Sequence, residues 1–271
     1  MTITLEAFGF VSELVRRESS IVLGSGKENL VESRLAPMAR EAGQRDVDTF
    51  LRALRSSYDP AVGKQVVEAL TTNETSWFRD NDPFTTLREV VLPELAQHRP
   101  SRSLRIWSAG CSSGQESYSI AMTALDTPEV AGWRVEVLGT DLSERMVERA
   151  RAGRYSQLEV NRGLPATSLV RHFRRAGSQW QIAPELAAAV TFRPLNLTRP
   201  FPGLGRFDVV FLRNVLIYFD LASKRDVLDR VRRVLAPDGF LLLGAAETTI
   251  GVDDAWERVP GERSSLYRLR G

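Results

Sequence analysis

The sequence predicts an α/β protein in which a mostly parallel sheet, covered by helices on both faces, follows an all-helical N-terminal part. Residues 1 to about 78 show only helical periodicity, with apolar residues three and four positions apart. Further along the chain, strand-like apolar runs alternate with helices, which is typical of parallel sheets. The chain has 271 residues, of which 43% are hydrophobic, so it can bury a sizeable core.

The N-terminal part contains four short amphipathic segments, which together predict a small helical bundle. Their apolar faces consist of Phe8, Val11, Leu14 and Val15; of Leu30, Val31, Leu35 and Met38; of Val47, Phe50, Leu51 and Leu54; and of Val62, Val66, Val67 and Leu70. We expect one domain over residues 1–78 and a second over residues 79–271.

The second domain is expected to begin with a helix over residues 82–91 and then to alternate strands with helices. Strands are expected at residues 104–109, 134–140, 190–196, 207–213 and 239–245. Helices are expected at residues 115–125, 143–152 and 220–235. The last two apolar runs, 255–260 and 264–270, have no helix between them and predict an antiparallel hairpin with Gly261 in its turn.

Residues 158–189 do not fit this alternation. They contain a short predicted helix over 166–173 and a β-like piece over 179–183. Between residues 151 and 193, seven arginines stand against two glutamates, a local balance of +5. We expect this basic stretch to contact an acidic partner surface.

Composition argues against several classes of protein. The formal net charge of +2, from 36 basic and 34 acidic residues, argues against binding to nucleic acid or to an anionic membrane surface. The single cysteine, Cys111, excludes an internal disulfide, and one cysteine and two histidines leave too few ligands for a Cys/His site, so we predict no metal site. The two histidines, His98 and His172, are expected at the surface. Without an apolar run of membrane-spanning length or a signal segment, we expect a cytoplasmic protein with no membrane insertion.

A strand, a tight turn and a helix over residues 105–122 form the most informative local pattern. Gly110 and Gly114 stand in the turn, where they permit positive φ angles and let a ligand approach the backbone closely. The next strand ends at Asp141, and an acid at this place in nucleoside-binding folds accepts hydrogen bonds from both ribose hydroxyls. Alternatively, Asp141 could cap the helix that begins near Ser143.

The residue at the start of the first helix distinguishes between nucleoside cofactors. A dinucleotide needs a glycine-rich turn for its pyrophosphate, whereas this turn places Glu116 at the helix start. A carboxylate there would repel a pyrophosphate and suits the ammonium group of an amino acid. The pattern therefore favours S-adenosylmethionine over NAD.

Four motifs, at residues 72–79, 108–122, 139–143 and 211–219, closely resemble in order and spacing those of the CheR family of chemotaxis receptor methyltransferases. They read TNETSWFR, SAGCSSGQESYSIAM, GTDLS and FLRNVLIYF. The resemblance covers nearly the whole chain. It implies a class I Rossmann-like, S-adenosylmethionine-dependent methyltransferase with a mostly parallel seven-stranded sheet, a terminal antiparallel hairpin and a small β-subdomain inserted at about 158–189.

This family transfers the methyl group of S-adenosylmethionine to glutamate side chains on the cytoplasmic helical bundle of chemoreceptors. The products are glutamate methyl esters, which serve adaptation in chemosensory signalling, and S-adenosylhomocysteine. The resemblance and the glycine turn imply a cofactor site made of Asn73, Thr75, Arg79, Gly110, Glu116, Asp141, Asn196, Leu197, Asn214 and Val215. The expected partner is a methyl-accepting chemoreceptor, and we expect a monomer.

The reaction implied by the resemblance needs no general base. A glutamate carboxylate is already ionised at neutral pH, so alignment with the activated methyl group should supply most of the rate. Arg79 is expected to hold the acceptor carboxylate with its planar guanidinium, unless it pairs with Asp80 or Asp82 at the surface. Tyr218 is expected to donate its hydroxyl to the same carboxylate, unless it is a core residue.

Two other functions remain compatible with these motifs. One is a methyltransferase that acts on nucleic acid or a small molecule, because the cofactor motifs do not name the acceptor. The other is a non-catalytic adaptor that binds the cofactor or a receptor. The sequence departs from the usual family residues at Gln115, Ser117 and Trp77. The turn within 173–182 looks shorter than in members that bind a receptor's C-terminal pentapeptide, so we expect docking without that tether.

Overall fold

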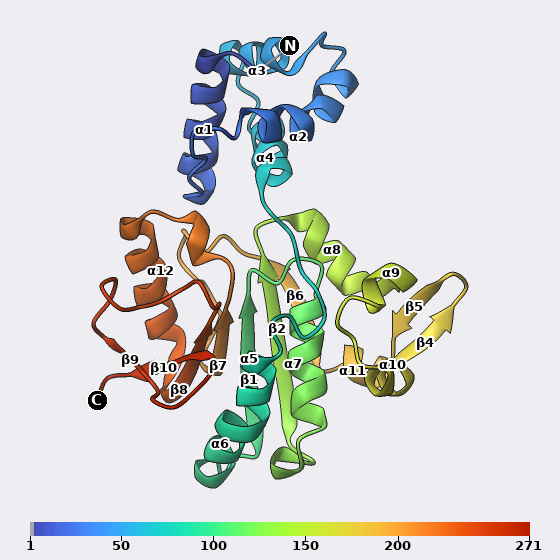
Figure 1. Cartoon of the computed structure of the whole chain (residues 1–271), viewed down its shortest axis with the longest axis vertical. Helices are drawn as coiled ribbons and strands as arrows, with labels where there is room; N and C mark the ends of the chain where they lie inside the picture. The colour runs from blue at the N-terminus through green and yellow to red at the C-terminus, as the bar shows by residue number, and fades with distance from the viewer. Residues whose placement is uncertain (1–2) are drawn as a thin grey trace. The chain divides into compact units, whose positions relative to one another are not determined.

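The computed structural model describes residues 3–271, which fall into two compact units (Figure 1). The N-terminal unit holds residues 3–72 together with the segment Tyr218–Ser223. The second unit holds Asn73–Ile217 and Lys224–Gly271. None of the helices formed by residues 3–271 combines the length and the hydropathy that a membrane span requires.

The described residues of the N-terminal unit form the helices α1 (Leu5–Ser19), α2 (Glu28–Glu41), α3 (Val47–Ser56) and α4 (Pro60–Leu70). Three of them begin after a side chain that accepts a hydrogen bond from the first turn: Thr4, Asp46 and Asp59. Val11 and Leu35 are among the predicted apolar positions that are fully buried. The predicted all-helical N-terminal part is therefore confirmed.

The second unit alternates helices with strands. Its strands are β1 (Ser103–Ala109), β2 (Arg134–Asp141), β3 (Arg154–Ser156), β4 (Phe173–Ala176), β5 (Gln179–Ile182), β6 (Val190–Pro194), β7 (Phe207–Leu212), β8 (Leu235–Leu243), β9 (Trp256–Arg258) and β10 (Ser265–Leu269). Its α-helices are α5 (Asp82–Thr86), α6 (Leu92–His98), α7 (Gln115–Leu125), α8 (Glu144–Ala152), α9 (Gln157–Val160), α10 (Ala166–His172), α11 (Pro184–Ala187) and, from residue 224 on, α12 (Leu221–Val234). The shorter helical segments are η1 (Leu87–Val91), η2 (Pro128–Val130) and η3 (Leu216–Tyr218).

Among the described residues, seven strands form one sheet in the order β6-β2-β1-β7-β8-β10-β9. The first five are parallel to their neighbours, and β10 pairs antiparallel with both β8 and β9. This arrangement confirms the predicted mostly parallel sheet with a closing hairpin. The chain moves from β1 to β2 on one side and later crosses to β7 on the other. The gap between the ends of β1 and β7 is thus the switch point at which parallel α/β sheets bind ligands.

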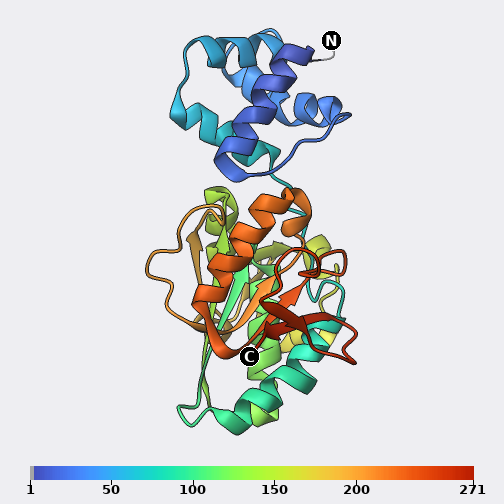
Figure 2. The same ribbon diagram turned by 90° about the vertical axis from the view of Figure 1, so that its left-hand side faces the viewer.

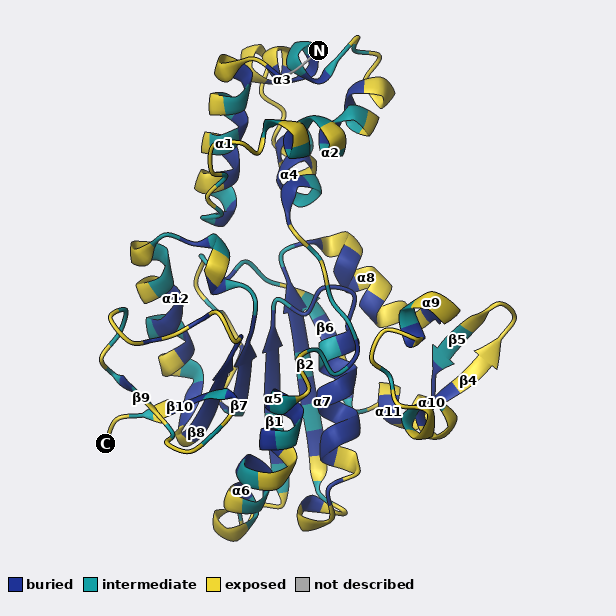
Figure 3. Cartoon of the chain, viewed as in Figure 1, coloured by how far each residue is buried: buried dark blue, intermediate teal, exposed yellow. Residues whose placement is uncertain are grey.

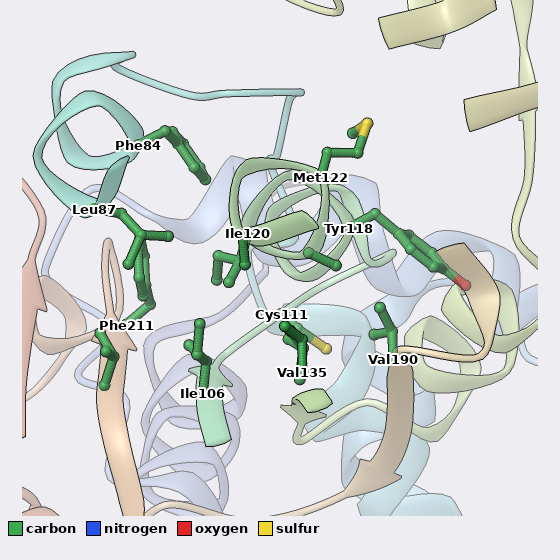
Figure 4. Packing of buried hydrophobic residues seen from close by; sticks show 14 of the residues in the cluster. Phe84, Leu87, Ile106, Cys111, Tyr118, Ile120, Met122, Val135, Val190 and Phe211 are labelled. Carbon is green, nitrogen blue, oxygen red and sulfur yellow. The ribbon is translucent and has the colours of Figure 1, made fainter. Parts of the chain in front are cut away.

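Apolar side chains from the sheet and the helices that cover it form the core of the second unit. Figure 4 shows Phe84, Leu87 and Ile120 gathered with Ile106 of β1 and Phe211 of β7, and all five are buried. In Figure 3 the strands β1, β7 and β8 are mostly buried, whereas the outer faces of the helices and the strand β4 are exposed. Figure 2, turned by 90° about the vertical axis, brings α12 (orange) and the C-terminal strands (red) to the front.

The small sheet within the second unit has the order β3-β5-β4 and is antiparallel. Gly177 and Ser178 make the two-residue turn between β4 and β5. The predicted β-like piece is β5. The short strand β3 lies just before residue 158, where the prediction placed the start of the insertion, because three residues are too few to show a period-two pattern.

Two of the parallel strands, β6 and β8, differ from their predicted bounds by two residues or more. β6 ends at Pro194, so Asn196 follows the strand. β8 begins at Leu235, although the Pro-Asp-Gly sequence that follows reads as a turn. The pairing register with β7 shifts between Phe207 and Val209, so this sequence forms a bulge inside the strand.

Two local predictions for this unit were incomplete or wrong. The helix predicted over 82–91 continues to His98, because the π-helical turn η1 lets a new helix begin with Pro93 in its first turn. His98 is exposed as predicted, but His172 is 7% exposed. Its Nε2 lies 3.2 Å from the Asp126 carboxylate, so the surface prediction for His172 was wrong.

Trp77 connects the first motif to the small sheet. Its ring centroid lies 4.8 Å from that of Tyr155 and 5.3 Å from that of Phe173, both in edge-on contacts. Its backbone N–H donates to the carbonyl of Arg162. Within the described residues, the buried indole Nε1 of Trp77 has no hydrogen-bond partner, so its contribution comes from packing.

Trp77→Ala should lower the free energy of unfolding by about 3–5 kcal/mol, because it leaves a large cavity among buried aromatic rings. Trp77→Phe should cost much less, since the lost N–H has no partner. Urea unfolding followed by circular dichroism measures both. Equal losses for the two variants would contradict a packing role.

Candidate active site

The glycine turn after β1 passes directly against the loop after β7. Gly110 and Gly114 have φ angles of +80° and +95°. A Cβ atom on Gly110 would lie 2.5 Å from Cγ2 of Val215, so a larger residue cannot stand there without displacing that loop. The backbone N–H groups of Gly110 and Cys111 both donate to the carbonyl of Thr140 at the end of β2. Predicted residues from two motifs therefore meet across the switch point.

Cys111 is a packing residue of this turn. It is 1% exposed, and burial, with the neighbouring Asp141 and Glu116 carboxylates, raises the pKa of its thiol well above the usual range. Such a thiol is a poor nucleophile.

Asp141 joins the glycine turn to the start of α8. Its carboxylate accepts hydrogen bonds from the backbone N–H of Ser112 at 2.8 Å and from that of Ser143 at 2.9 Å, and the residue is 8% exposed. The Ser143 hydroxyl, rather than Asp141, caps α8 by accepting from the N–H of Met146. The capping alternative for Asp141 is therefore wrong. Carboxylate oxygens accept more than one bond each, so the predicted ribose contact remains compatible with this geometry.

Glu116 forms a buried ion pair that the sequence analysis missed. Its carboxylate accepts from the hydroxyl of Ser108 at 2.8 Å and from the guanidinium of Arg213 at 2.9 Å. The Arg213 side chain is fully buried, and that of Glu116 is 12% exposed. Burial raises the pKa of Glu116, Arg213 and Ser108 oppose that rise, and the Glu247 carboxylate adds to it. An arginine inside an apolar strand motif could have indicated this partner, because arginine is rarely buried unpaired.

The same arginine also holds the first motif. Arg213 donates to the carbonyl of Arg79 and to the carboxylate of Asp80, both at 2.8 Å. Phe78, Asp80 and Asn81 all have positive φ angles, between 46° and 66°, which non-glycine residues rarely adopt. Arg213 thus stabilises a strained turn.

Arg79 and the start of its motif contact nearby backbone groups. A guanidinium N–H of Arg79 donates to the carbonyl of Glu74 at 2.9 Å, while Asp80 pairs with Arg213. Asn73 accepts, through its carbonyl, a hydrogen bond from the Ser112 hydroxyl at 2.8 Å. Thr75 is half-buried on the same loop. The first motif therefore lies beside the glycine turn, as the resemblance implies.

Asn196 and Leu197 follow β6, next to the end of β2. The N–H of Leu195 donates to the Asp141 carbonyl, and the Asn196 side chain accepts from the N–H and hydroxyl of Thr198. Leu197 is 7% exposed.

Asn214 and Val215 follow β7 in a turn that begins with a φ of +57° at Asn214. The Glu247 carboxylate accepts from the backbone N–H groups of both residues at 2.8 Å. The sequence analysis missed Glu247, although its place just after a predicted strand could have indicated it.

Tyr218 ends η3 and belongs to the N-terminal unit, where its carbonyl accepts from the N–H of Val22. It is partly exposed. Its predicted catalytic role remains a prediction.

A groove of about 910 Å³ opens beside the first motif. Residues of that motif, of α5, of the outer side of α7 and of the loop before α10 line it. Among the predicted site residues, all of which are described, Arg79 alone lines this groove. Arg79 therefore stands between the strand-end turns and an open surface.

Two family models match the chain. The CheR methyltransferase all-alpha domain matches residues 6–71, and the CheR methyltransferase SAM-binding domain matches residues 73–264. The chain belongs to the CheR methyltransferase family. The predicted resemblance, the methyltransferase activity and the S-adenosylmethionine cofactor are thereby confirmed.

CheR relatives match over almost their whole length. The chemotaxis protein methyltransferase 1 of Pseudomonas aeruginosa is 40% identical over 262 residues, which cover 94% of this chain and 95% of the relative. The chemotaxis protein methyltransferase of Vibrio parahaemolyticus is 38% identical over 274 residues, with coverage of 100% and 99%. That of Escherichia coli is 36% identical, with coverage of 89% and 83%.

The raised pKa of Glu116 predicts a pH-dependent stability. In the unfolded chain a glutamate has a pKa near 4.5, and the folded-state pKa lies higher. The folded protein therefore retains a proton that the unfolded chain has lost, and stability from Glu116 falls as the pH rises through the folded-state pKa. Relative to Glu116→Gln, the wild type should lose stability in urea unfolding as the pH rises above the unfolded-state pKa near 4.5. A relative gain would show that the attraction of Arg213 outweighs burial.

Proposed function

We propose that this CheR enzyme methylates glutamate carboxylates on the cytoplasmic helical bundle of chemoreceptors and so serves adaptation in chemosensory signalling. Membership of the family, over nearly the whole length of the chain, carries this proposal. Esterification removes one negative charge per glutamate, which would reduce repulsion between packed receptor helices and bias their signalling state. The enzyme would act in the cytoplasm as a monomer.

The residues at the strand ends fit S-adenosylmethionine. The positive φ angles of Gly110 and Gly114 shape the tight turn, and the Glu116 and Asp141 carboxylates suit an ammonium group and a ribose diol. In our proposal, Asn73, Thr75, Arg79, Asn196, Leu197, Asn214 and Val215 complete this cofactor site.

The protein itself would mainly align the acceptor carboxylate with the methyl group. S-adenosylmethionine supplies a methyl group activated by its sulfonium. The acceptor carboxylate would take this methyl group and the electron pair of the broken bond would stay on sulfur, so the residues of this chain would need to move no proton. Arg79 would hold the other carboxylate oxygen from the groove side. The strained turn at residues 78–81, held by Arg213, would fix the direction of Arg79.

The insertion would contribute to receptor docking. Arg174 and Arg175 are exposed on β4, beside a two-residue turn. So short a turn supports docking without a pentapeptide tether.

Arg79→Ala and Asp141→Ala should each abolish methyl transfer, because one removes the acceptor contact and the other the ribose contact. The assay measures tritiated methyl groups transferred to a receptor fragment. Arg134→Ala is the matched control, since Arg134 is 79% exposed at the opposite end of β2 and should leave the rate unchanged. Full activity in the Arg79 and Asp141 variants would contradict the proposed site.

The acceptor class can be tested on the labelled product. A label on a glutamate ester should be released by mild base, whereas a methylated amine or a methylated nucleic-acid base should retain it. A base-stable product would favour another acceptor.

Reversing Arg174 and Arg175 to glutamate should weaken binding to an acidic receptor fragment, on the order of tenfold at low salt. The control reverses Arg232 and Arg233, which are exposed on α12 and pair with Asp229. Equal effects of the two double variants on the dissociation constant would argue against docking by the insertion.

A further inference from the structure

Glu247 connects the ends of the neighbouring strands β7 and β8. One carboxylate oxygen accepts from the backbone N–H groups of Gly244 at 2.7 Å and Asn214 at 2.8 Å. The other accepts from those of Val215 at 2.8 Å and Ile217 at 3.3 Å. Glu247 is 6% exposed, so four backbone donors surround a buried anion. Such charge-assisted bonds are stronger than bonds between neutral groups.

Gly244 makes this contact possible. A Cβ atom at this position would lie 2.7 Å from Oε2 of Glu247 and 3.0 Å from the backbone nitrogen of Asn214. Because the φ angle of Gly244 is not positive, alanine could adopt its backbone conformation. The close packing, rather than the backbone angle, therefore excludes a side chain here.

The loop held by Glu247 determines the geometry of the switch point. The side chain of Val215 lies against Gly110. Arg213, just before the loop, pairs with the Glu116 carboxylate and donates to the carbonyl of Arg79 in the first motif. The side chain of Arg213 fixes one end of the loop, and the carboxylate of Glu247 fixes its backbone. A shift of the loop would therefore displace Val215 against the glycine turn.

We propose that Glu247 is a positioning residue of the cofactor site, which sets the place of Asn214 and Val215 through their backbone N–H groups. This inference rests on the proposed function in one respect, namely that Asn214 and Val215 contact the cofactor. Glu247 itself need not touch the ligand. Glutamine at this position would keep the size of the side chain but would turn an NH₂ group toward two of the backbone N–H donors. Two of the four hydrogen bonds would therefore be lost.

The test is a calorimetric titration of the full chain with S-adenosylhomocysteine, which needs no acceptor. Glu247→Gln should raise the dissociation constant on the order of tenfold, with the protein still folded by circular dichroism. Glu257→Gln is the matched control, because Glu257 pairs with Arg268 on the exposed face of the C-terminal hairpin and should bind as the wild type does. Gly244→Ala should weaken binding in the same direction and replaces Glu247→Gln if that variant does not fold.

A double-mutant cycle with Asn214→Ala separates positioning from general stability. If Glu247 positions the loop, the effect of Glu247→Gln on the dissociation constant should shrink in the Asn214→Ala background. Weaker binding in Asn214→Ala with unchanged binding in Glu247→Gln and Gly244→Ala would overturn the inference and leave the proposed site intact. Additive effects would also overturn it. Unchanged binding in Asn214→Ala would remove the premise and with it the proposed cofactor contacts.

Discussion

The buried guanidinium of Arg213 joins three segments that lie far apart in the sequence. It pairs with Glu116 at the start of α7 and with Asp80 just after the first motif, and it donates to the carbonyl of Arg79, the last residue of that motif. An arginine without these partners would be costly to bury, and the partners without the arginine would leave acidic groups uncompensated. The first motif, the glycine turn and the loop after β7 therefore depend on one another for their positions.

The acidic groups near the carboxyl ends of the strands are stabilised in two different ways. Glu116 depends on a cation and a hydroxyl, whereas Glu247 is surrounded by backbone N–H groups. Asp141 also accepts from backbone, at the start of α8 and in the glycine turn. Several carboxylates can thus lie near one another at low exposure. Such an arrangement suits a ligand with cationic groups, because hydrogen bonds and ion pairs within the protein already compensate most of the free-energy cost of removing these carboxylates from water.

The periodicity of the apolar residues, together with the turn residues between the segments, made much of the fold predictable. The alternation of apolar runs predicted the five parallel strands, and the four motifs indicated which strand ends form the site. The contacts between individual residues could not be predicted from the sequence in the same way. Nothing in the periodicity shows that Arg213 points inward to Glu116, or that Glu247 accepts from a loop 30 residues away, because these contacts depend on tertiary structure. The bulge in β8 and the strand β3 were missed because a turn-like sequence and a three-residue strand give no regular pattern.

The environment of Cys111 has a practical consequence for studying this enzyme. Its thiol is enclosed in the glycine turn, where deprotonation is disfavoured, and it is the single cysteine of the chain. The native sequence is therefore already suited to site-directed labelling. A cysteine introduced at Ser178, in the exposed turn of the insertion, would react with a maleimide dye while Cys111 stays protected. A single fluorophore could then test the proposed receptor docking without any change to the methyltransferase core.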